Sequence, residues 1–187
     1  LMRHGPSAHV QVGWINWEGF RQWREAYEAA GILEGVQVPP ELQTFLQSLR
    51  ESGGIIVCSD ARRAVETARL VAGDRDVLIS PLLRELDLES PRLPGLRLPL
   101  LAWAFAVGGR ILVQSLRRNY PSVAESTRIR QAAEWLNELA QEHPLVVAIT
   151  HASFRTRLAG QLHQTGWNYE PARRTGRPWS AWRLRRS

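Results

Sequence analysis

An arginine and a histidine stand side by side near the start of the chain, in the run Leu1-Met2-Arg3-His4-Gly5. Two apolar residues lead directly into them, which is typical of a buried strand that ends in a tight turn. Arginine presents a fixed fork of donors to a tetrahedral anion, and a neutral imidazole nitrogen can attack phosphorus and later leave it. Gly5 tolerates the backbone angles of such a turn and lets an anion approach closely. The types and spacing of these residues therefore favour phosphoryl chemistry.

Further polar residues follow predicted strands later in the chain. Ser59 comes directly after an apolar run and is expected to cap a helix whose first turn carries Arg62 and Arg63. Free backbone N–H groups at the start of such a helix favour an anion. Glu85 leaves another expected strand, and His151 follows the most convincing buried strand of the chain. Because the C-terminal ends of parallel strands share one edge of a sheet, we expect these groups to meet the opening turn in one crevice.

Taken in order, four motifs resemble those of the histidine phosphatase superfamily, also called the phosphoglycerate mutase-like family. They are the opening RHG, the segment SDARRAVETA, a mid-chain LRE and a late THA, and together they span nearly the whole chain. The resemblance implies that His4 is the nucleophile and that Arg3, Arg63 and His151 hold the phosphate oxygens. It implies that Glu85 donates a proton to the leaving oxygen. It implies no metal ion and no other cofactor.

Two departures from the family pattern affect the expected site. Relatives often carry asparagine three residues after the position of Ser7, where this chain has Val10, so one polar contact near the phosphate is absent or supplied elsewhere. Ser7 itself is expected to add a hydroxyl donor to the phosphate pocket. Many relatives also carry Gly-Glu-Ser before a late helix, where this chain has Tyr120-Pro121-Ser122. The loss of that carboxylate makes Glu85 the stronger candidate acid.

The expected elements alternate between strands and helices within one domain, residues 1–187. Continuous apolar runs predict strands buried on both faces, as in a parallel sheet covered by helices. These strands are Ile55–Cys58 and Leu145–Thr150. Val77–Ile79 is expected as another strand, besides a first strand that is expected to lack upstream residues and an edge strand over 180–184. Apolar residues at helical spacing predict helices over 14–30, 42–49, 61–70, 129–140 and 153–162. The expected fold class is α/β, a three-layer α/β/α sandwich with a mainly parallel central sheet.

The segment 86–118 interrupts this alternation. It contains three prolines and then two apolar runs, 100–107 and 111–113, which Gly108-Gly109 separates. The segment is too short to span a membrane and too long for a simple connection. We expect an inserted cap with one or two short helices over the mouth of the site, with contact to a membrane surface as the alternative.

Composition bounds the classes of function. The 187 residues carry a formal charge of +6, and all 24 basic residues are arginine, which argues against a lysine nucleophile. Excess arginine is compatible with an acidic small substrate, a nucleic acid or the codon usage of the source genome. The arginines of the tail are expected to face solvent, and no nucleic acid partner is expected. No apolar run reaches the ~18 residues of a membrane span and no secretory signal is evident, so we expect a cytoplasmic protein with Cys58 as a buried strand thiol.

The expected function is hydrolysis of a phosphomonoester through a phosphohistidine intermediate on His4. A phosphoglycerate mutase-type phosphotransferase is the first alternative, disfavoured because nothing in 86–118 matches the longer substrate loops expected of mutases. A non-catalytic anion-binding module is disfavoured further, because every residue of the expected set is present. The expected partner is a phosphorylated small molecule, with a phosphorylated protein as an open alternative, and the oligomeric state also stays open.

Overall fold

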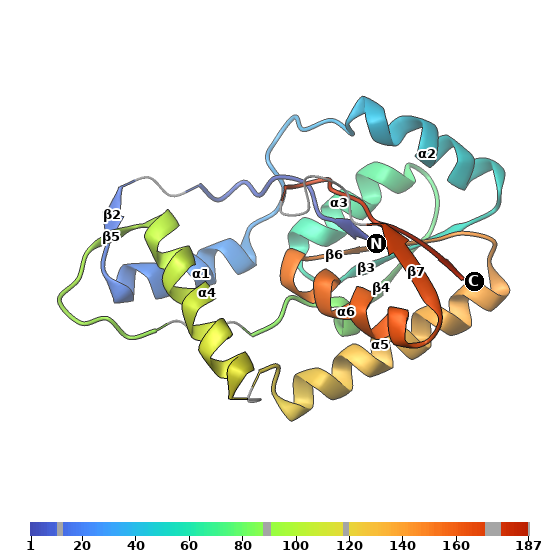
Figure 1. The fold of residues 1–187 in the computed structure, drawn as a ribbon. Coiled ribbons are helices and arrows are strands. Elements are labelled where there is room, and N and C mark those ends of the chain that lie inside the picture. Colours follow the sequence, from blue (N-terminus) through green and yellow to red (C-terminus); the bar gives the residue numbers. More distant parts are fainter. Residues whose placement is uncertain (11–12, 88–90, 118–119, 171–176, 187) are drawn as a thin grey trace.

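A parallel sheet forms the centre of the molecule (Figure 1). The computed structural model describes residues 1–10, 13–87, 91–117, 120–170 and 177–186. The sheet is four-stranded, in the spatial order β1 (Met2–Arg3), β6 (Val146–Thr150), β3 (Ile55–Ser59) and β4 (Val77–Ser80), and each neighbouring pair is parallel. The predicted parallel sheet is confirmed, and each predicted strand of the sheet overlaps the observed one.

Helices cover both faces of the sheet. On one face, α2 (Pro40–Glu51) and α3 (Arg62–Ala72) pack on Ile56, Cys58 and Ile149. On the other face, α5 (Val123–Glu142) and α6 (Ala152–Gln164) pack on Val57 and Ala148. Because successive strand residues point to opposite faces, the continuous apolar runs supply both layers of the core. The predicted three-layer α/β/α class is therefore confirmed.

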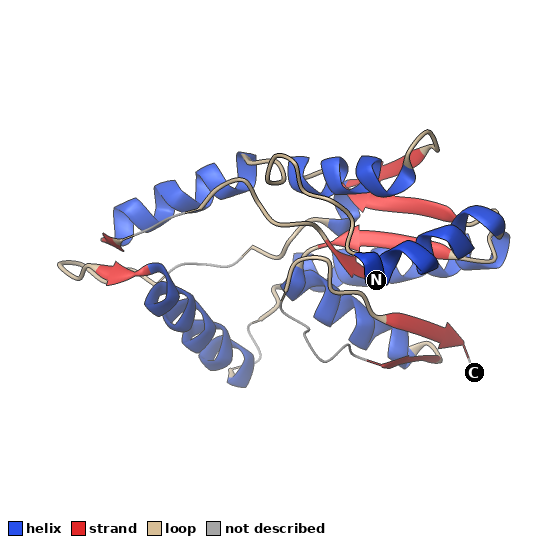
Figure 2. Cartoon of the chain, turned by 90° about the horizontal axis from the view of Figure 1, so that it is seen from above, coloured by secondary structure: helices blue, strands red, loops and turns tan. Residues whose placement is uncertain are grey.

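A smaller lobe stands to one side of the sheet (Figure 2). It consists of α1 (Trp17–Ala29), α4 (Leu100–Leu116) and a two-residue antiparallel pairing of β2 (Trp14–Ile15) with β5 (Leu98–Pro99). Its core is Phe20, Trp103 and Val107, and the rings of Phe20 and Trp103 stack with their centroids 4.9 Å apart.

The prediction of one or two short helices in the segment 86–118 is wrong. The segment forms a single helix of 17 residues, α4, which continues through Gly108-Gly109. Burial of Trp103 and Val107 before the glycine pair, and packing of Ile111 against the same cluster after it, outweigh the low helix propensity of the two glycines. Residues 88–90 and 118 of the expected insertion lie outside the described residues.

Three predicted boundaries are corrected. Trp14 belongs to β2 and not to the first helix, and its side chain is exposed. Ser59 ends β3, and Ala61 holds the N-cap position of α3 that was expected for Ser59. The helix α1 ends at Ala29, one residue before the expected end, and a Cβ atom at Gly31 would lie 2.1 Å from the carboxylate of Glu66. A side chain at this position would displace the Glu66 carboxylate, which accepts from the backbone N–H of Ile32 over 2.8 Å.

The tail returns to the first strand. It forms an antiparallel pair of β7 (Trp167–Glu170) with β8 (Arg183–Arg186), so the expected edge strand begins later than residue 180. Before β8, Ala181 forms an antiparallel bridge with Met2, and the backbone N–H of Trp182 donates to the carbonyl of Leu1 over 2.8 Å. The arginines of β8 are exposed, as predicted.

Two smaller predictions concern Cys58 and membrane spans. Cys58 is fully buried in β3, so the predicted buried strand thiol is confirmed, and burial raises the pKa of this thiol to about 12. In the described part of the chain, no helix has both the length and the apolar character that crossing a bilayer requires.

Candidate active site

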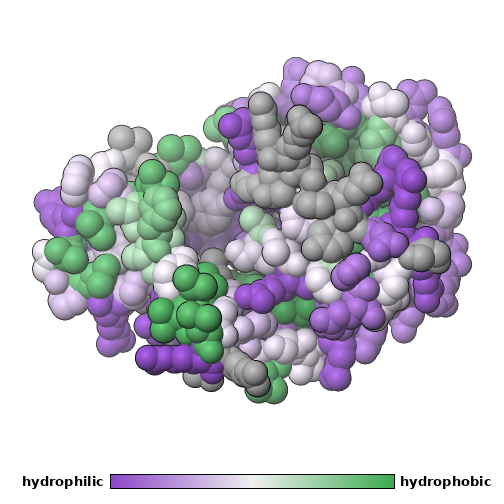
Figure 3. Space-filling model, viewed as in Figure 1, coloured by the Kyte–Doolittle hydropathy of each residue, from purple (hydrophilic) through white to green (hydrophobic). Residues whose placement is uncertain are grey.

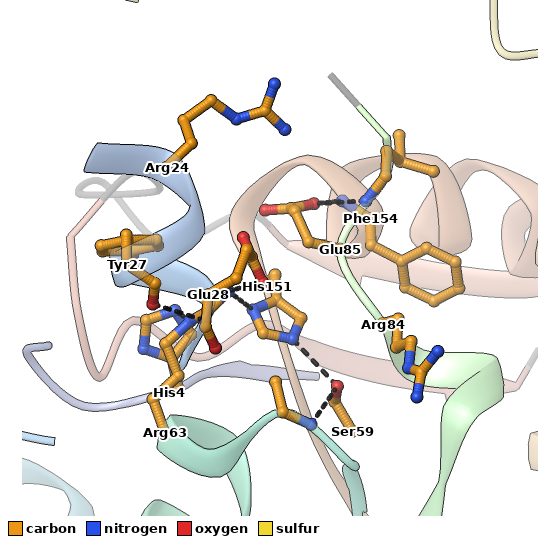
Figure 4. Close-up of polar contacts among 12 residues, drawn as sticks. His4, Arg24, Tyr27, Glu28, Ser59, Arg63, Arg84, Glu85, His151 and Phe154 are labelled. Carbon is orange, nitrogen blue, oxygen red and sulfur yellow. Dashed lines mark hydrogen bonds and ion pairs between the residues drawn. The ribbon is translucent and has the colours of Figure 1, made fainter. Parts of the chain in front are cut away.

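The predicted polar residues gather at the C-terminal edge of the sheet (Figure 4). Arg3 ends β1 and His4 follows it, while His151 follows β6 as the N-cap residue of α6. Glu85 lies two residues beyond the short 3₁₀-helix η1 (Pro81–Leu83), which itself follows β4. Parallel strands point all of these chain ends the same way, so one edge of the sheet collects them.

The contacts of His4 fix which ring nitrogen carries the proton. Its Nδ1 lies 2.7 Å from the carbonyl oxygen of Gly5, and its Nε2 lies 3.3 Å from Nε of Arg63. Because a guanidinium only donates, Nε2 of His4 must accept and Nδ1–H must donate to Gly5. His4 therefore directs a lone pair on Nε2 toward the cationic side of the site.

Arg63 connects the two histidines to the end of α1. Its guanidinium is buried and donates from Nη2 to Nδ1 of His151 over 3.2 Å and to the carboxylate of Glu28 over 3.0 Å. Its Nη1 donates to the carbonyl oxygen of Tyr27 over 3.1 Å, and its Cζ lies 4.6 Å from the centre of the Tyr27 ring. These contacts fix the guanidinium of Arg63 beside Nε2 of His4.

His151 is oriented by the end of the neighbouring strand. Since Nδ1 accepts from Arg63, the proton of the neutral ring is on Nε2, which lies 3.0 Å from Oγ of Ser59. The rings of His4 and His151 have centroids 5.1 Å apart. Ser59 thus serves as a partner of His151 rather than as the expected helix cap.

Both imidazoles are neutral near pH 7. Burial and the charge of Arg63 lower the pKa of His4 to about 3. Burial, Arg63 and the neighbouring ring lower the pKa of His151 to about 2. A neutral His4 keeps its lone pair available, which a nucleophile requires.

The neutral imidazoles lead to a prediction about stability. In phosphate-free buffer, the free energy of unfolding should fall as the pH is lowered from about 6.5 toward 4, because the unfolded chain binds protons at both imidazoles and the folded chain excludes them. Each imidazole should add a slope of about 1.4 kcal/mol per pH unit. Urea unfolding of the parent, His4→Gln and His151→Gln over this range measures the slope.

Each of these two variants should lose its share of the slope. The same substitution at His163, an exposed histidine of α6, is the control. If both variants kept the parent's slope, the imidazoles would be charged in the folded state.

Glu85 is held at the N-terminal end of α6. Its Oε1 accepts from the backbone N–H group of Phe154 over 2.8 Å (Figure 4). The same oxygen accepts from the N–H of Leu86 over 3.0 Å, and Oε2 accepts from that of Ser153 over 3.4 Å. Burial raises the pKa of Glu85, while these backbone donors and the charge of Arg3 oppose the rise. A carboxyl group with a raised pKa can carry a proton closer to neutral pH, as a general acid must.

The other predicted residues differ in their distance from this cluster. Arg3 lies close enough for its charge to affect the pKa values of His4, Glu85 and His151. Ser7 is engaged in the loop beyond the turn, where its Oγ accepts from the backbone N–H of His9 over 3.2 Å. Arg62 is exposed and pairs with Glu66 over 2.7 Å, so it takes no part in the cluster.

Supporting residues that sequence reasoning missed surround the opening turn. Thr67, part of the SDARRAVETA motif, accepts from the N–H of Gly5 over 2.9 Å. Trp179 adopts a left-handed φ of 64° and donates its backbone N–H to the carbonyl of His4 over 3.3 Å. Its ring would lie 3.0 Å from a Cβ atom at Gly5, so only glycine fits there without displacement.

Two charged residues were also missed. Glu28 pairs with Arg63, although no local pattern distinguishes it from the other carboxylates of α1. Arg128 of α5 donates from Nη2 to the carbonyl oxygen of Glu85 over 3.2 Å and from Nη1 to that of Arg84 over 2.8 Å. It therefore holds the loop that carries Glu85.

The donor types around the cluster suit an anion. Arginine and imidazole nitrogens are ligands for phosphate oxygens. In the ranges that the structure describes, no group of three or more His, Cys, Asp or Glu side chains is placed to hold a metal ion.

Comparison with known proteins identifies the fold. No protein-family model matches the chain, and no curated protein matches its sequence. A phosphoserine phosphatase from Entamoeba histolytica, solved with 3-phosphoglyceric acid, is 18% identical with a TM-score of 0.52, over 87% of this chain and 78% of that chain.

Two mycobacterial structures are similar over more of the chain. The product of the open reading frame Rv3214 from Mycobacterium tuberculosis is 17% identical with a TM-score of 0.54, over 98% of this chain and 87% of that chain. Mycobacterial hydrolase 1 is 18% identical with a TM-score of 0.54, over 98% of this chain and 94% of that chain. The order β1-β6-β3-β4, the flanking helices and these neighbours agree on one assignment: the chain has the fold of the histidine phosphatase superfamily, the phosphoglycerate mutase-like family.

Proposed function

We propose that this protein is a phosphohydrolase that cleaves a phosphomonoester through a phosphohistidine on His4. The observation that carries the proposal is the arrangement of His4, whose Nδ1–H is held by Gly5 so that the Nε2 lone pair faces Arg63 and His151. Burial keeps this imidazole neutral. A neutral, oriented nitrogen beside fixed cations suits attack on a phosphate dianion.

In the first step, Nε2 of His4 attacks phosphorus as the bond between phosphorus and the ester oxygen breaks. Arg3, Arg63 and His151 stabilise the charge on the other oxygens of the phosphate. An anion between the two imidazoles raises the pKa of His151, so His151 binds the phosphate as an imidazolium. Protonated Glu85 gives its proton to the leaving oxygen, and the alcohol departs.

In the second step, water attacks the phosphohistidine. Ionised Glu85 takes a proton from this water as the bond between Nε2 and phosphorus breaks. Inorganic phosphate leaves, and both His4 and Glu85 return to their starting states. The three phosphate ligands are protein side chains, so the proposed cycle uses no metal ion or other cofactor. Ser7 is proposed as a further hydroxyl donor once its loop meets the substrate.

We propose hydrolysis rather than a mutase reaction, in which the phosphoenzyme would pass its phosphate to a second acid. Two of the similar folds belong to proteins named a phosphoserine phosphatase and a hydrolase, which supports this order. The proposed substrate is a phosphorylated small molecule, and a phosphorylated protein is the alternative.

A single assay separates hydrolysis from mutase activity. With 3-phosphoglycerate, a trace of 2,3-bisphosphoglycerate and excess EDTA, we expect free phosphate or no reaction, and no 2-phosphoglycerate. A panel of phosphomonoesters under the same chelation should reveal at least one substrate that releases phosphate. Formation of 2-phosphoglycerate faster than phosphate release would establish the mutase alternative, and activity that EDTA removes and a divalent metal restores would refute the metal-free cycle.

A further inference from the structure

The guanidinium of Arg63 has five N–H donors, and the structure gives five acceptors for them. Nε donates to Nε2 of His4 over 3.3 Å, and Nη2 donates to Nδ1 of His151 over 3.2 Å. The other three acceptors belong to the last turn of α1 (Figure 4). They are the carbonyl oxygens of Tyr27 and Glu28, at 3.1 and 3.3 Å from Nη1, and the carboxylate of Glu28, at 3.0 Å from Nη2. A phosphate oxygen that binds Arg63 must therefore replace one of these acceptors.

The acceptors divide between two edges of the guanidinium plane. Nε–H and the neighbouring hydrogen of Nη2 form one edge, a parallel fork that matches two oxygens of a phosphate. In the proposed cycle, Nε2 of His4 bonds to phosphorus and Nδ1 of His151 takes a proton, so neither nitrogen accepts from Arg63 any longer. The fork is then released to the phosphate, whereas the contacts of the opposite edge with α1 can stay.

The end of α1 is a firm support for that opposite edge. The last carbonyl groups of a helix lack regular N–H partners and lie at the negative end of its dipole, which suits a guanidinium. On another side, Phe20 of α1 stacks on Trp103 of α4, with ring centroids 4.9 Å apart. The helix α4 is the one whose exposed apolar side chains gather on the surface of the lobe in Figure 3. The lobe core thus holds α1 in place independently of Arg63.

We propose that Glu28 is a positioning residue for Arg63. Its carboxylate and the carbonyl groups of α1 hold one edge of the guanidinium, so that the fork on the other edge stays aimed at the phosphate. This role rests on the proposed function, in which Arg63 binds the phosphate. The side chain of Arg63 is 1% exposed and that of Glu28 is 50% exposed, so Glu28 also supplies a countercharge to a buried cation.

Two substitutions separate the acceptor of Glu28 from its charge. Glu28→Gln and Glu28→Ala both remove the negative charge, but only Glu28→Ala removes the oxygen that accepts from Nη2. In an NMR titration with inorganic phosphate, Glu28→Ala should bind about tenfold more weakly than Glu28→Gln, because its charge-assisted hydrogen bonds to phosphate are no longer aimed. With an ester that the parent hydrolyses, kcat/KM should differ between the two variants by about 10- to 100-fold. Circular dichroism checks that both variants fold.

The same two substitutions in an Arg63→Met background show whether Glu28 acts through Arg63. Their affinities for phosphate should then agree within about twofold, because the residue that Glu28 positions is gone. Glu25→Ala is the matched control, since it removes another glutamate of α1, which pairs with Arg21 at the surface. It should bind phosphate like the parent.

Equal affinities of Glu28→Ala and Glu28→Gln for phosphate would refute the positioning role, and so would a gap between them that persists without Arg63. Tighter binding by Glu28→Ala than by Glu28→Gln would also refute it, because Glu28 would then compete with phosphate. A gap in phosphate affinity, together with a parent that turns over no ester, would instead refute the proposed hydrolysis and support the positioning role. A parent that binds no phosphate would refute both.

Discussion

His4→Ala should lower kcat/KM toward the best phosphomonoester by about 10⁴-fold or more, because the substitution removes the proposed nucleophile. His151 should not replace it, because the proposed cycle has this imidazole bind the phosphate as an imidazolium, which has no lone pair for attack. The loss should fall on kcat, since Arg3, Arg63 and His151 still bind the phosphate. Steady-state kinetics measures both constants.

The comparison needs a folded variant. His4 is buried, so thermal unfolding followed by circular dichroism accompanies the kinetics, and His163→Ala at an exposed position is the control. Activity of folded His4→Ala within tenfold of the parent would rule out a covalent intermediate on His4.

Glu85→Gln should slow alkyl phosphates by about 10²–10⁴-fold in formation of the phosphoenzyme, the usual contribution of a positioned acid. The amide keeps the size of the carboxyl group but has no proton to give to a poor leaving group. An aryl phosphate such as nitrophenyl phosphate should lose far less in this step, because nitrophenolate leaves without a proton. Single-turnover measurements with one alkyl and one aryl substrate give the two ratios.

Asp87→Asn provides the comparison, since Asp87 lies two residues away in the same loop and is exposed. It should affect both substrates little. Equal losses for the alkyl and aryl substrates in Glu85→Gln would mean that Glu85 only shapes the pocket. A leaving-group effect in Asp87→Asn instead would transfer the role of the acid to Asp87.

The sequence allowed us to predict which residues lie at the C-terminal edge of the sheet, because the strands and the helix that carry them have local signals. The runs before Ser59 and His151 are continuously apolar, which indicates central parallel strands, and such strands place the residues that follow them at one edge. The position of Arg63 in the first turn of α3 followed from helical spacing alone.

The partners of these residues depend on contacts between distant segments. Glu28 meets Arg63 across 35 positions, and Trp179 reaches His4 from the tail, so neither contact leaves a local pattern. Ser59 was misassigned as a cap because a serine between a strand and a helix suits either role. Its contact with His151 is made across 92 positions.

The length of α4 was missed for a different reason. Gly108-Gly109 is a strong local signal for a break, since glycine lowers helix propensity by about 1 kcal/mol per residue. Packing of Trp103 and Val107 against α1 overrides that signal, and it is a tertiary contact.

The most direct test of the proposed function is to trap the intermediate. The protein is mixed with ³²P-labelled nitrophenyl phosphate, quenched within milliseconds in alkali, and digested for mass spectrometry of the N-terminal peptide. We expect a phosphate that is stable to alkali and labile to acid, bound to His4 and absent from folded His4→Ala. A burst of product without any labelled protein, or a label on His151 that survives in His4→Ala, would contradict the assignment of His4 as the nucleophile.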